Sequence, residues 1–533
     1  MKQLINLILS AALLFISSCK KENAAMLSNK QGILLVGNTA EPESLDPQVA
    51  TGVIESNIIR ALFEGLCVED PKKDGNSLPG VAESWTHTDD FKIWTFKLRS
   101  SNRWSDGKPL TTDDFLFSYE RILSPKFAAK YAGLLYLIEG AEQFNKGETS
   151  DFSTVGVKAI NPHTLEIRLK APTPFLPELT KHYTWYPVPK HAVLRKGKID
   201  EQHTNWTDLD NIVSNGPFQL KSWQFNYLIE VEKNQQYWDT NVVKLNGIKF
   251  LPVSNQYTEN RMFAANQLHV TATIPAEMIE YSKAKFPKNI RQETYLSSNF
   301  LRCNVNGKLK DVRIRKAISL SLPRQVIVDN LLKGGQKPST SLTPPFGDYK
   351  PPMISRKNLT EAKQLLADAG YPNGENFPEI DLLTTKRETS VKIAEAIANI
   401  LKRDLGIIVN IKKYEWQTYL AELSSMNYDL GTGGWTGDYI DPTTFLDMWR
   451  EGDGNNRTGW SSKEYENILD DAAQTADPKK RLSMLAQAEE LMLKEYPIIN
   501  INWNTSNYLL RSEVKGWYPL LLNNHPYKFV ELK

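Results

Sequence analysis

The chain has 533 residues, a formal net charge of +2 at pH 7 and 24% charged residues. This length is too great for one ordinary hydrophobic core, so we expect two or three domains. The near-neutral charge gives no indication of a surface for nucleic acid or for an acidic membrane. The composition is typical of a soluble globular protein.

The N-terminal segment MKQLINLILSAALLFISSCKKENAA predicts an export signal. Lys2 precedes an apolar run over residues 4–16, which is too short to span a bilayer. The ISSC that follows resembles a bacterial lipobox, whose cysteine is acylated and becomes the new N-terminus. We therefore expect residues 1–18 to be a lipoprotein signal peptide and residues 19–30 a lipidated linker that begins at Cys19. Ordinary signal cleavage is the alternative.

Two more cysteines, Cys67 and Cys303, lie in strand-like patterns, LFEGLCVED and FLRCNVN. A buried free thiol in a strand behaves as a small hydrophobe. Their spacing does not decide whether they pair. We do not expect a disulfide framework to hold this protein together.

Alternating apolar and polar residues predict half-buried strands. These are IWTFKLR (93–99), TLEIRLK (164–170) and IEVEKN (229–234). Between the first two, Asp106 and Gly107 predict a tight turn, and Thr112 or Asp113 is expected to cap a helix. Caps and helical spacing predict three later helices. These are NLTEAKQLLADAGYP (358–372), ETSVKIAEAIANILKRDLG (388–406) and KKRLSMLAQAEELMLKEYP (479–497). The mixture predicts an α/β chain of several lobes.

No short motif supports an enzyme. The sequence has no H-E-x-x-H pair, no G-x-S-x-G elbow and no phosphate-binding P-loop. The stretch GTGGWTGDYIDPTTF (431–445) nearly matches the dinucleotide fingerprint, but Thr436 stands where the last glycine should be. A hydrolase with paired carboxylates stays open, because the sequence does not show which acidic side chains face each other.

Seven segments, found in this order, carry a resemblance to a known family. They are LFEGLCVED, VAESWTHTDDFKIWTFKLRSSNRWSDGKPLTTDDFLFSYERIL, NIVSNGPFQLKSW, NQQYWD, DVRIRKAISLSLPRQVI, EAKQLLADAGYPNG and GDYIDPTTFLDMW. Together they resemble the family 5 extracellular solute-binding proteins, most closely the oligopeptide-binding proteins of ABC importers. The resemblance extends over essentially the whole mature chain.

The resemblance implies an α/β, periplasmic-binding-protein-like fold of class II (cluster C). Two lobes would close over the ligand, and a small extra domain would accompany them. Lobe I would comprise residues 31–63, 188–296 and 505–533. The extra domain would comprise residues 64–187, and lobe II residues 297–504.

Within residues 431–445, the two aspartates are expected to have different roles. Asp441 precedes Pro442 and reads as a helix N-cap. In the family, the aspartate at the place of Asp438 receives the α-ammonium of the bound peptide, and GWTGDY matches that pattern. A buried ammonium needs a charged partner. Gly433 and Gly434 are expected to let the peptide backbone approach, so that it pairs as a strand.

The resemblance also implies other ligand contacts, each of which could instead be ordinary packing. Gly434 and Thr436 would bind the peptide main chain, with Thr51 and Val53 on the facing lobe. Trp435 would wall a side-chain pocket, and Tyr131 would touch the ligand. We also propose Arg302 or Lys308 as the cation that binds the peptide carboxylate. Two departures are notable. Thr432 replaces an arginine of well-studied relatives, and a cysteine pair of some relatives falls on Thr436 and a serine near 297–298.

We therefore expect a lipid-anchored extracytoplasmic receptor, a monomer without catalytic activity, cofactor or nucleic-acid partner. It would deliver short peptides to an ABC permease whose ATPase is a separate chain, because no nucleotide motif is present here. A binder of nickel, haem, cell-wall peptide or another solute is the alternative on the same fold, although scarce histidines argue against a metal. An extracytoplasmic hydrolase and a surface adhesin or chaperone-like protein are more distant alternatives.

Overall fold

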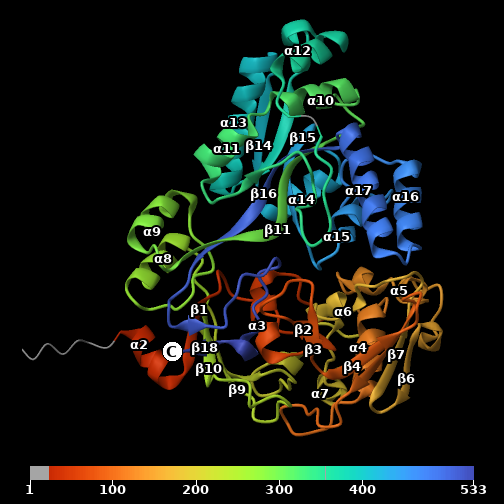
Figure 1. Ribbon diagram of the computed structural model, residues 1–533, viewed down its shortest axis with the longest axis vertical. Coiled ribbons are helices and arrows are strands. Elements are labelled where there is room, and N and C mark those ends of the chain that lie inside the picture. Colours follow the sequence, from red (N-terminus) through yellow and green to blue (C-terminus); the bar gives the residue numbers. More distant parts are fainter. Residues whose placement is uncertain (1–22, 355) are drawn as a thin grey trace, which may run out of the picture.

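The computed structural model describes residues 23–354 and 356–533, and it consists of an upper lobe above a broader lower part (Figure 1). The expected signal peptide and Cys19 lie outside the described residues. Within the described part of the chain, no helix is long and apolar enough to cross a membrane.

Lobe I is built on a four-stranded sheet of order β1-β10-β9-β8, in which β1 runs parallel to β10. Its strands are β1 (Ile33–Gly37), β8 (Phe218–Gln224), β9 (Leu228–Lys233) and β10 (Gly247–Leu251). The accompanying helices are α2 (Ala24–Gln31), α3 (Val53–Leu62), α7 (Lys190–Lys196), α8 (Gln256–Ala264) and α9 (Ile279–Lys285). The short pair β17 (Val514–Lys515) and β18 (Glu531–Leu532) lies beside it.

The expected extra domain contains a separate antiparallel sheet of order β4-β5-β7-β6. Its strands are β4 (Ala82–His87), β5 (Ile93–Leu98), β6 (Val157–Asn161) and β7 (Thr164–Arg168), next to the hairpin-like pair β2 (Cys67–Glu69) and β3 (Ser77–Pro79). Its helices are α4 (Thr112–Leu123), α5 (Ala141–Asn145) and α6 (Leu176–Leu179). Trp94 and Trp104 are buried in a core that continues into lobe I.

Lobe II is built on a six-stranded mixed sheet of order β12-β16-β11-β15-β13-β14. Its strands are β11 (Ile290–Cys303), β12 (Lys337–Pro338), β13 (Ile380–Thr385), β14 (Val409–Tyr414), β15 (Leu430–Thr436) and β16 (Ile498–Leu509). One hydrophobic core of lobe II is covered by helices α10 (Val312–Ser321), α11 (Arg324–Ile327), α12 (Leu359–Asp368) and α13 (Glu388–Leu405). Two other cores are bordered by helices α14 (Trp416–Ser424), α15 (Thr443–Leu446), α16 (Lys463–Ala473) and α17 (Pro478–Glu495).

Two long antiparallel strands, β11 and β16, run from the lower part of the molecule into lobe II (Figure 1). The expected lobe boundaries, at residues 296–297 and 504–505, fall inside them. Their register shifts between Thr294 and Ser298, so the ladder is interrupted where the strands pass between the lobes. Such a bulge bends and twists a strand pair locally. After β16 the chain returns to lobe I, where Tyr527 and Val530 join the core and Lys528 pairs with Asp239 at 2.9 Å.

The three strands and three helices expected from the pattern are confirmed to within about two residues, except that the helix expected over 358–372 ends at Asp368. Gly406 ends α13 in the left-handed region at φ 70°, as Gly32 ends α2 at φ 67°. One expected cap is wrong by one residue. Thr111, rather than Thr112 or Asp113, caps α4 and forms a capping box with Asp114, because Thr112 already has helical geometry.

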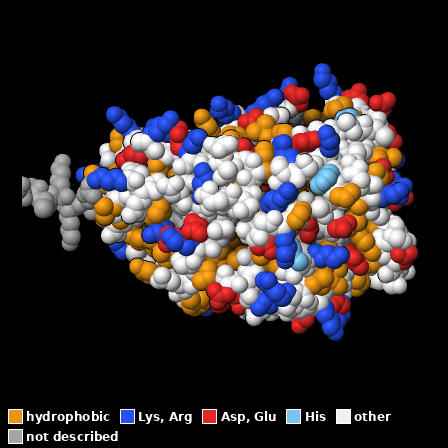
Figure 2. All heavy atoms as spheres, turned by 90° about the horizontal axis from the view of Figure 1, so that it is seen from below, with side chains coloured by type: hydrophobic (Ala, Val, Ile, Leu, Met, Phe, Trp, Pro, Cys, Tyr) orange, Lys and Arg blue, Asp and Glu red, His pale blue; other side chains and the backbone are white. Residues whose placement is uncertain are grey.

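Cys67 and Cys303 are both buried and free, each in a different core. The chain therefore gains its stability from packing rather than from a bond between these two thiols. On the face of the molecule seen in Figure 2, basic and acidic side chains are interspersed, in line with the small net charge.

Candidate functional site

Asp438 lies just beyond the end of β15, in the loop that leads to α15. Its backbone N–H donates to the Thr444 hydroxyl at 2.9 Å, and the preceding Gly437 N–H donates to the Leu296 carbonyl at 2.8 Å. These bonds fix the loop to α15 and to the crossing strand β11. The position of Asp438 is therefore set by lobe II and by the strand that connects the lobes.

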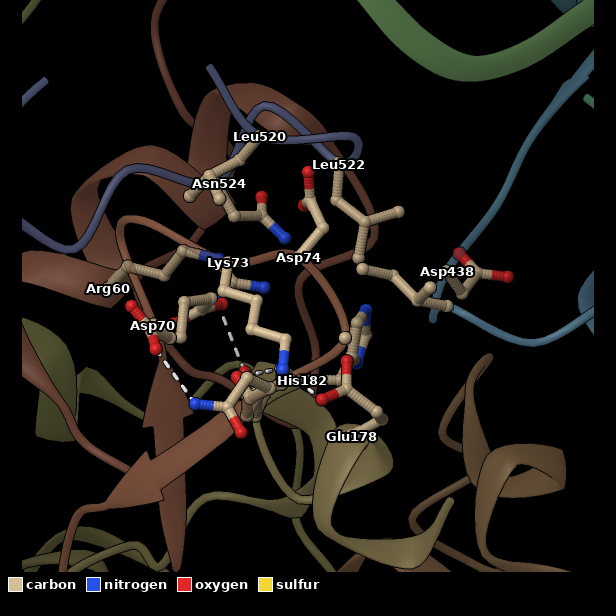
Figure 3. A pocket seen from close by; sticks show the side chains of 15 residues that line it. Arg60, Asp70, Lys73, Asp74, Glu178, His182, Asp438, Leu520, Leu522 and Asn524 are labelled. Atoms are coloured by element: carbon tan, nitrogen blue, oxygen red, sulfur yellow. Dashed lines mark hydrogen bonds and ion pairs between the residues drawn. The ribbon is translucent and has the colours of Figure 1, made fainter. Parts of the chain in front are cut away.

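The Asp438 carboxylate has no cationic partner within the described part of the chain. Among the residues that the structure describes, none donates a hydrogen bond to it, and no line in Figure 3 reaches it. Burial alone raises its pKa to about 7. A carboxylate held out of water without a counterion is costly in the ionised form, which is the state that a ligand cation would stabilise.

Three phenol groups lie near enough to interact electrostatically with this carboxylate. Tyr131 and Tyr183 come from the extra domain and Tyr295 from β11. Burial and the proximity of Asp438 raise the pKa of all three. Tyr131 packs edge-on against Tyr183, with ring centroids 6.4 Å apart. Aromatic faces attract ammonium groups, so carboxylate and rings together suit a cation. The sequence pointed to Tyr131, but Tyr183 and Tyr295 were missed.

Asp441 has a structural role that is larger than the expected cap. Its carboxylate accepts from the Thr443 N–H at 3.1 Å, but the predicted N-cap is wrong by one residue, because Pro442 rather than Asp441 is the N-cap of α15. It also forms a buried two-pronged ion pair with Arg481 of α17, at 2.6 and 2.9 Å. No local pattern indicates this pair, because forty residues separate the two side chains.

The second half of β15 has one unpaired edge. β11 pairs with all of β15, from Cys303 opposite Leu430 to Ser297 opposite Thr436. On its other side, β13 pairs only with Leu430 and Gly431, and no further strand of the described chain continues along that edge. An extended peptide could therefore add its main chain beside residues 432–436.

The glycines of β15 serve the packing of lobe II. A Cβ atom at Gly433 would lie 2.2 Å from the Arg302 guanidinium, and one at Gly434 would lie 2.9 Å from the Ser298 carbonyl. The close approach that requires glycine is therefore to β11. This differs from the expectation that these glycines make room for a ligand backbone.

Trp435 and Thr436 are both held by neighbouring protein groups. The Trp435 indole N–H donates to the Thr444 carbonyl at 2.7 Å, and its ring borders the core around α15 and α17. The Thr436 hydroxyl donates to the Ser297 hydroxyl at 3.0 Å. Thr436 and Ser297 are direct cross-strand partners, so a hydrogen bond occupies the place implied for a cysteine pair in some relatives.

The two cations proposed for the ligand carboxylate do not lie together with Asp438. Lys308 pairs with Asp429 at 3.0 Å, and Asp429 precedes β15 whereas Asp438 follows it. A seven-residue strand separates them by about 20 Å. Arg302 is 5% exposed and lies beneath Gly433, where burial lowers its pKa. Both side chains therefore contact other groups of lobe II.

A cavity of mixed charge adjoins Asp438, and we call it the Asp438 cavity (Figure 3). Asp438 enters it from lobe II, Asp74 and Glu178 line it from the extra domain, and Leu522 lines it from the C-terminal loop. The Glu178 carboxylate pairs with Lys181. Arg60 of α3 also lines this cavity, but its guanidinium is paired with Glu69.

Val53 is the first residue of α3, and Thr51 lies two residues before it. Thr51 is exposed, and Val53 is 61% exposed and lines a second cavity, of about 290 Å³. Three N–H groups of the first helical turn lack helical acceptors, which leaves donors near Val53 for a ligand. Arg60 lines both cavities, so they adjoin each other at α3.

The lobes touch each other around the site. Phe175 of the extra domain stacks on Tyr439, with centroids 5.7 Å apart, and the Arg481 guanidinium lies 4.8 Å from the Phe175 ring. On the other side, Glu277 pairs with Lys392 of α13 at 2.6 Å. These contacts place Asp438 between parts of the chain that are connected by β11 and β16.

Within residues 23–354 and 356–533, no group of three or more histidine, cysteine, aspartate or glutamate side chains could hold a metal ion. The loop around Asp438, the unpaired edge of β15 and the Asp438 cavity form a candidate binding site between lobes, and the second cavity adjoins it from lobe I. This arrangement defines a solute-binding protein of two lobes.

The chain belongs to the bacterial extracellular solute-binding proteins of family 5, which it matches over residues 77–457. It is 34% identical over 502 residues to the periplasmic oligopeptide-binding protein OppA of Salmonella typhimurium, covering 92% of this chain and 90% of that one. The family consists of receptors rather than enzymes, as the sequence predicted.

Solved structures agree with the expected fold. A periplasmic oligopeptide-binding protein of Borrelia burgdorferi, OppAIV, has a TM-score of 0.82 at 32% identity, covering 94% of this chain and all of that one. Haemophilus influenzae OppA in complex with the peptide RPPGFSPFR has a TM-score of 0.82 at 30% identity, covering 94% of this chain and 99% of that one. The α/β, cluster C architecture is thereby confirmed.

Proposed function

We propose that this chain is an extracytoplasmic receptor that binds short peptides between its lobes and delivers them to an ABC transporter. The observation that carries the proposal is the Asp438 carboxylate, which is largely withdrawn from water near three tyrosines and has no counterion among the described residues. The α-ammonium of a peptide supplies the missing charge. The names of the related proteins, which describe oligopeptide binding, support the same class of ligand.

The free edge of β15 supplies the second half of the recognition. A peptide main chain beside residues 432–436 would satisfy the N–H and C=O groups that β13 leaves unpaired, apart from the Thr432 carbonyl, which accepts from the Tyr419 hydroxyl. Main-chain atoms and the terminal ammonium are common to all peptides. We therefore infer that the receptor accepts many sequences, and that its permease and ATPase partners are separate chains.

Calorimetry on a double-mutant cycle tests the role of Asp438. Asp438→Asn is expected to weaken binding of tetra-alanine by two to four orders of magnitude, because stranding a buried charge costs about 3–5 kcal/mol. N-acetyl-tetra-alanine should bind the unaltered protein as poorly as tetra-alanine binds the variant. On the variant, acetylation of the peptide should lower the affinity only slightly further. Additive losses would show that Asp438 does not receive the ammonium.

Asp477→Asn is a matched control for this cycle. Asp477 is an exposed N-cap of α17, and asparagine caps helices equally well. The affinity of this variant for both peptides should equal that of the unaltered protein.

Recovery of hydrolysed rather than intact tetra-alanine after incubation with the protein would instead favour the hydrolase alternative.

The lipid anchor at Cys19 is a separate part of the proposal, supported by the apolar run and the ISSC sequence before it. Cys19→Ala should move the protein from the membrane fraction to a soluble or uncleaved form, with tetra-alanine affinity unchanged. An unaltered membrane fraction would contradict lipidation at this residue.

A further inference from the structure

We propose that the second cavity binds an aromatic side chain of the peptide, and that it disfavours a basic one. This inference rests on the proposed peptide-binding function and assigns it a side-chain preference. We call this space the aromatic cavity. The residues that the argument uses are Val53, Val270, Tyr508, Trp517, His525 and Tyr527.

The aromatic cavity is large enough for a ring. Its volume is about 290 Å³, whereas an apolar cavity of about 150 Å³ already accommodates benzene. Val53 forms part of its wall and is 61% exposed, so the cavity opens beside the start of α3. A side chain of a peptide lying along that turn can enter it without displacing the protein backbone.

Four rings form a continuous aromatic wall. Trp517 stacks on His525, with centroids 4.1 Å apart, and meets Tyr527 edge-on at 6.1 Å. Tyr508 of β16 lies 6.3 Å from His525 and completes the group. Offset and edge-on contacts at these distances are the geometry in which aromatic rings attract one another. An additional ring from the ligand extends this packing.

The charges around the aromatic cavity select against a cation. No aspartate or glutamate lines it among the described residues, and its one charged lining residue is Arg60. The cavity thus lacks the carboxylate that a buried ammonium or guanidinium requires. His525 does not change this balance at neutral pH, because burial lowers its pKa to about 3 and keeps it uncharged.

The loop over residues 520–525 separates the two cavities. Leu520, Leu522 and Asn524 line the Asp438 cavity, whereas Asn523 and His525 line the aromatic cavity. The loop turns here, because the Asn523 N–H donates to the Leu520 carbonyl at 2.8 Å and Asn523 has φ 55°, and its successive side chains therefore line different cavities. A single peptide can therefore place its ammonium in one cavity and a side chain in the other.

A phenylalanine scan tests the inference. Each position of tetra-alanine is replaced in turn by phenylalanine or by lysine, and the dissociation constants are measured by calorimetry. At one position phenylalanine should improve affinity by about tenfold to a hundredfold, the range expected for burying a large apolar side chain. Lysine at that position should not improve it. Equal affinities at all four positions, or a greater gain with lysine, would overturn the inference.

Two substitutions locate the effect. Ala272→Phe places a ring in the aromatic cavity, and Trp517→Leu removes part of its wall. Each should abolish most of the preference for phenylalanine over alanine, which is a ratio measured within one variant. Ala284→Phe adds the same ring to an exposed position of α9 and should leave the ratio unchanged. An undiminished ratio in both cavity variants, with native circular dichroism, would refute the assignment.

The experiment separates this inference from the function on which it rests. If tetra-alanine and all its substituted forms fail to bind the unaltered protein, the peptide-receptor proposal fails, and this inference with it. If tetra-alanine binds and phenylalanine brings no gain at any position, only the aromatic cavity loses its role.

Discussion

Replacing Asp438 by asparagine should stabilise the empty receptor while impairing its binding. Burial raises the Asp438 pKa from 3.8 to about 7 in the folded protein. A carboxyl group whose pKa is higher when folded destabilises the folded state above that pKa, and the penalty disappears as the pH falls towards 3.8. Three units at about 1.36 kcal/mol each give a penalty of about 4 kcal/mol at pH 8.

Asp438→Asn removes this penalty but leaves a buried amide without partners, which costs about 1–3 kcal/mol. The net gain at pH 8 is therefore expected to be about 1–3 kcal/mol. At pH 5 more than half of the parent's penalty has gone, because Asp438 is then protonated in the folded state. The variant should thus lose its advantage in acid.

Thermal unfolding of the parent and the variant at pH 8 and pH 5, without peptide, measures this difference. Comparing the two proteins at each pH cancels the titration of all other groups. Asp477→Asn should match the parent at both values. A variant that is less stable than the parent at pH 8, or a stability difference that does not depend on pH, would refute the assignment of an uncompensated charge to Asp438.

Three other outcomes are expected. Peptide affinity should fall about tenfold per pH unit below pH 7, because the ammonium binds only after Asp438 has released its proton. Calorimetry in buffers of different ionisation heat should detect the released proton. Constant affinity from pH 7 to 5 would contradict the mechanism. Asp441→Asn should lower the free energy of unfolding by about 3–5 kcal/mol, because it strands Arg481 in a buried site; denaturant unfolding measures this loss, and unchanged stability would show that only the hydrogen bond to the Thr443 N–H matters. Tetra-alanine at a hundred times its dissociation constant should stabilise the parent by about 2.7 kcal/mol, measured as a rise in the unfolding midpoint; the absence of any rise would mean that it does not bind the folded state preferentially.

Local features of the fold could be predicted from the sequence because their determinants are neighbours in the chain. Asn358 caps α12 and Gly406 ends α13, and both signals lie within one turn of the helix that they delimit. The pattern also predicted the N-cap of α4 to within one residue of its observed position at Thr111. Family resemblance supplied the order of the lobes, which no local pattern could give.

The site was predictable only in part, because distant residues decide which charges are free. Asp441 and Asp438 look alike in sequence, yet Arg481 neutralises the first, and no described residue neutralises the second. Lys308 was a reasonable cation for a ligand until the structure placed Asp429 beside it. The aromatic cavity was not predictable, since its walls come from several separate segments of the chain.

The path of the chain through β11 and β16 has a consequence for the order of folding. Lobe II is formed by one continuous stretch between these strands, whereas the core of lobe I also requires Tyr527 and Val530. Contacts between residues that are close in sequence form faster than those between remote ones. Because the chain is synthesised from its N-terminus, lobe II can therefore fold while the core of lobe I still lacks part of its residues. Lobe I remains the part exposed to misfolding until the segment after β16 arrives.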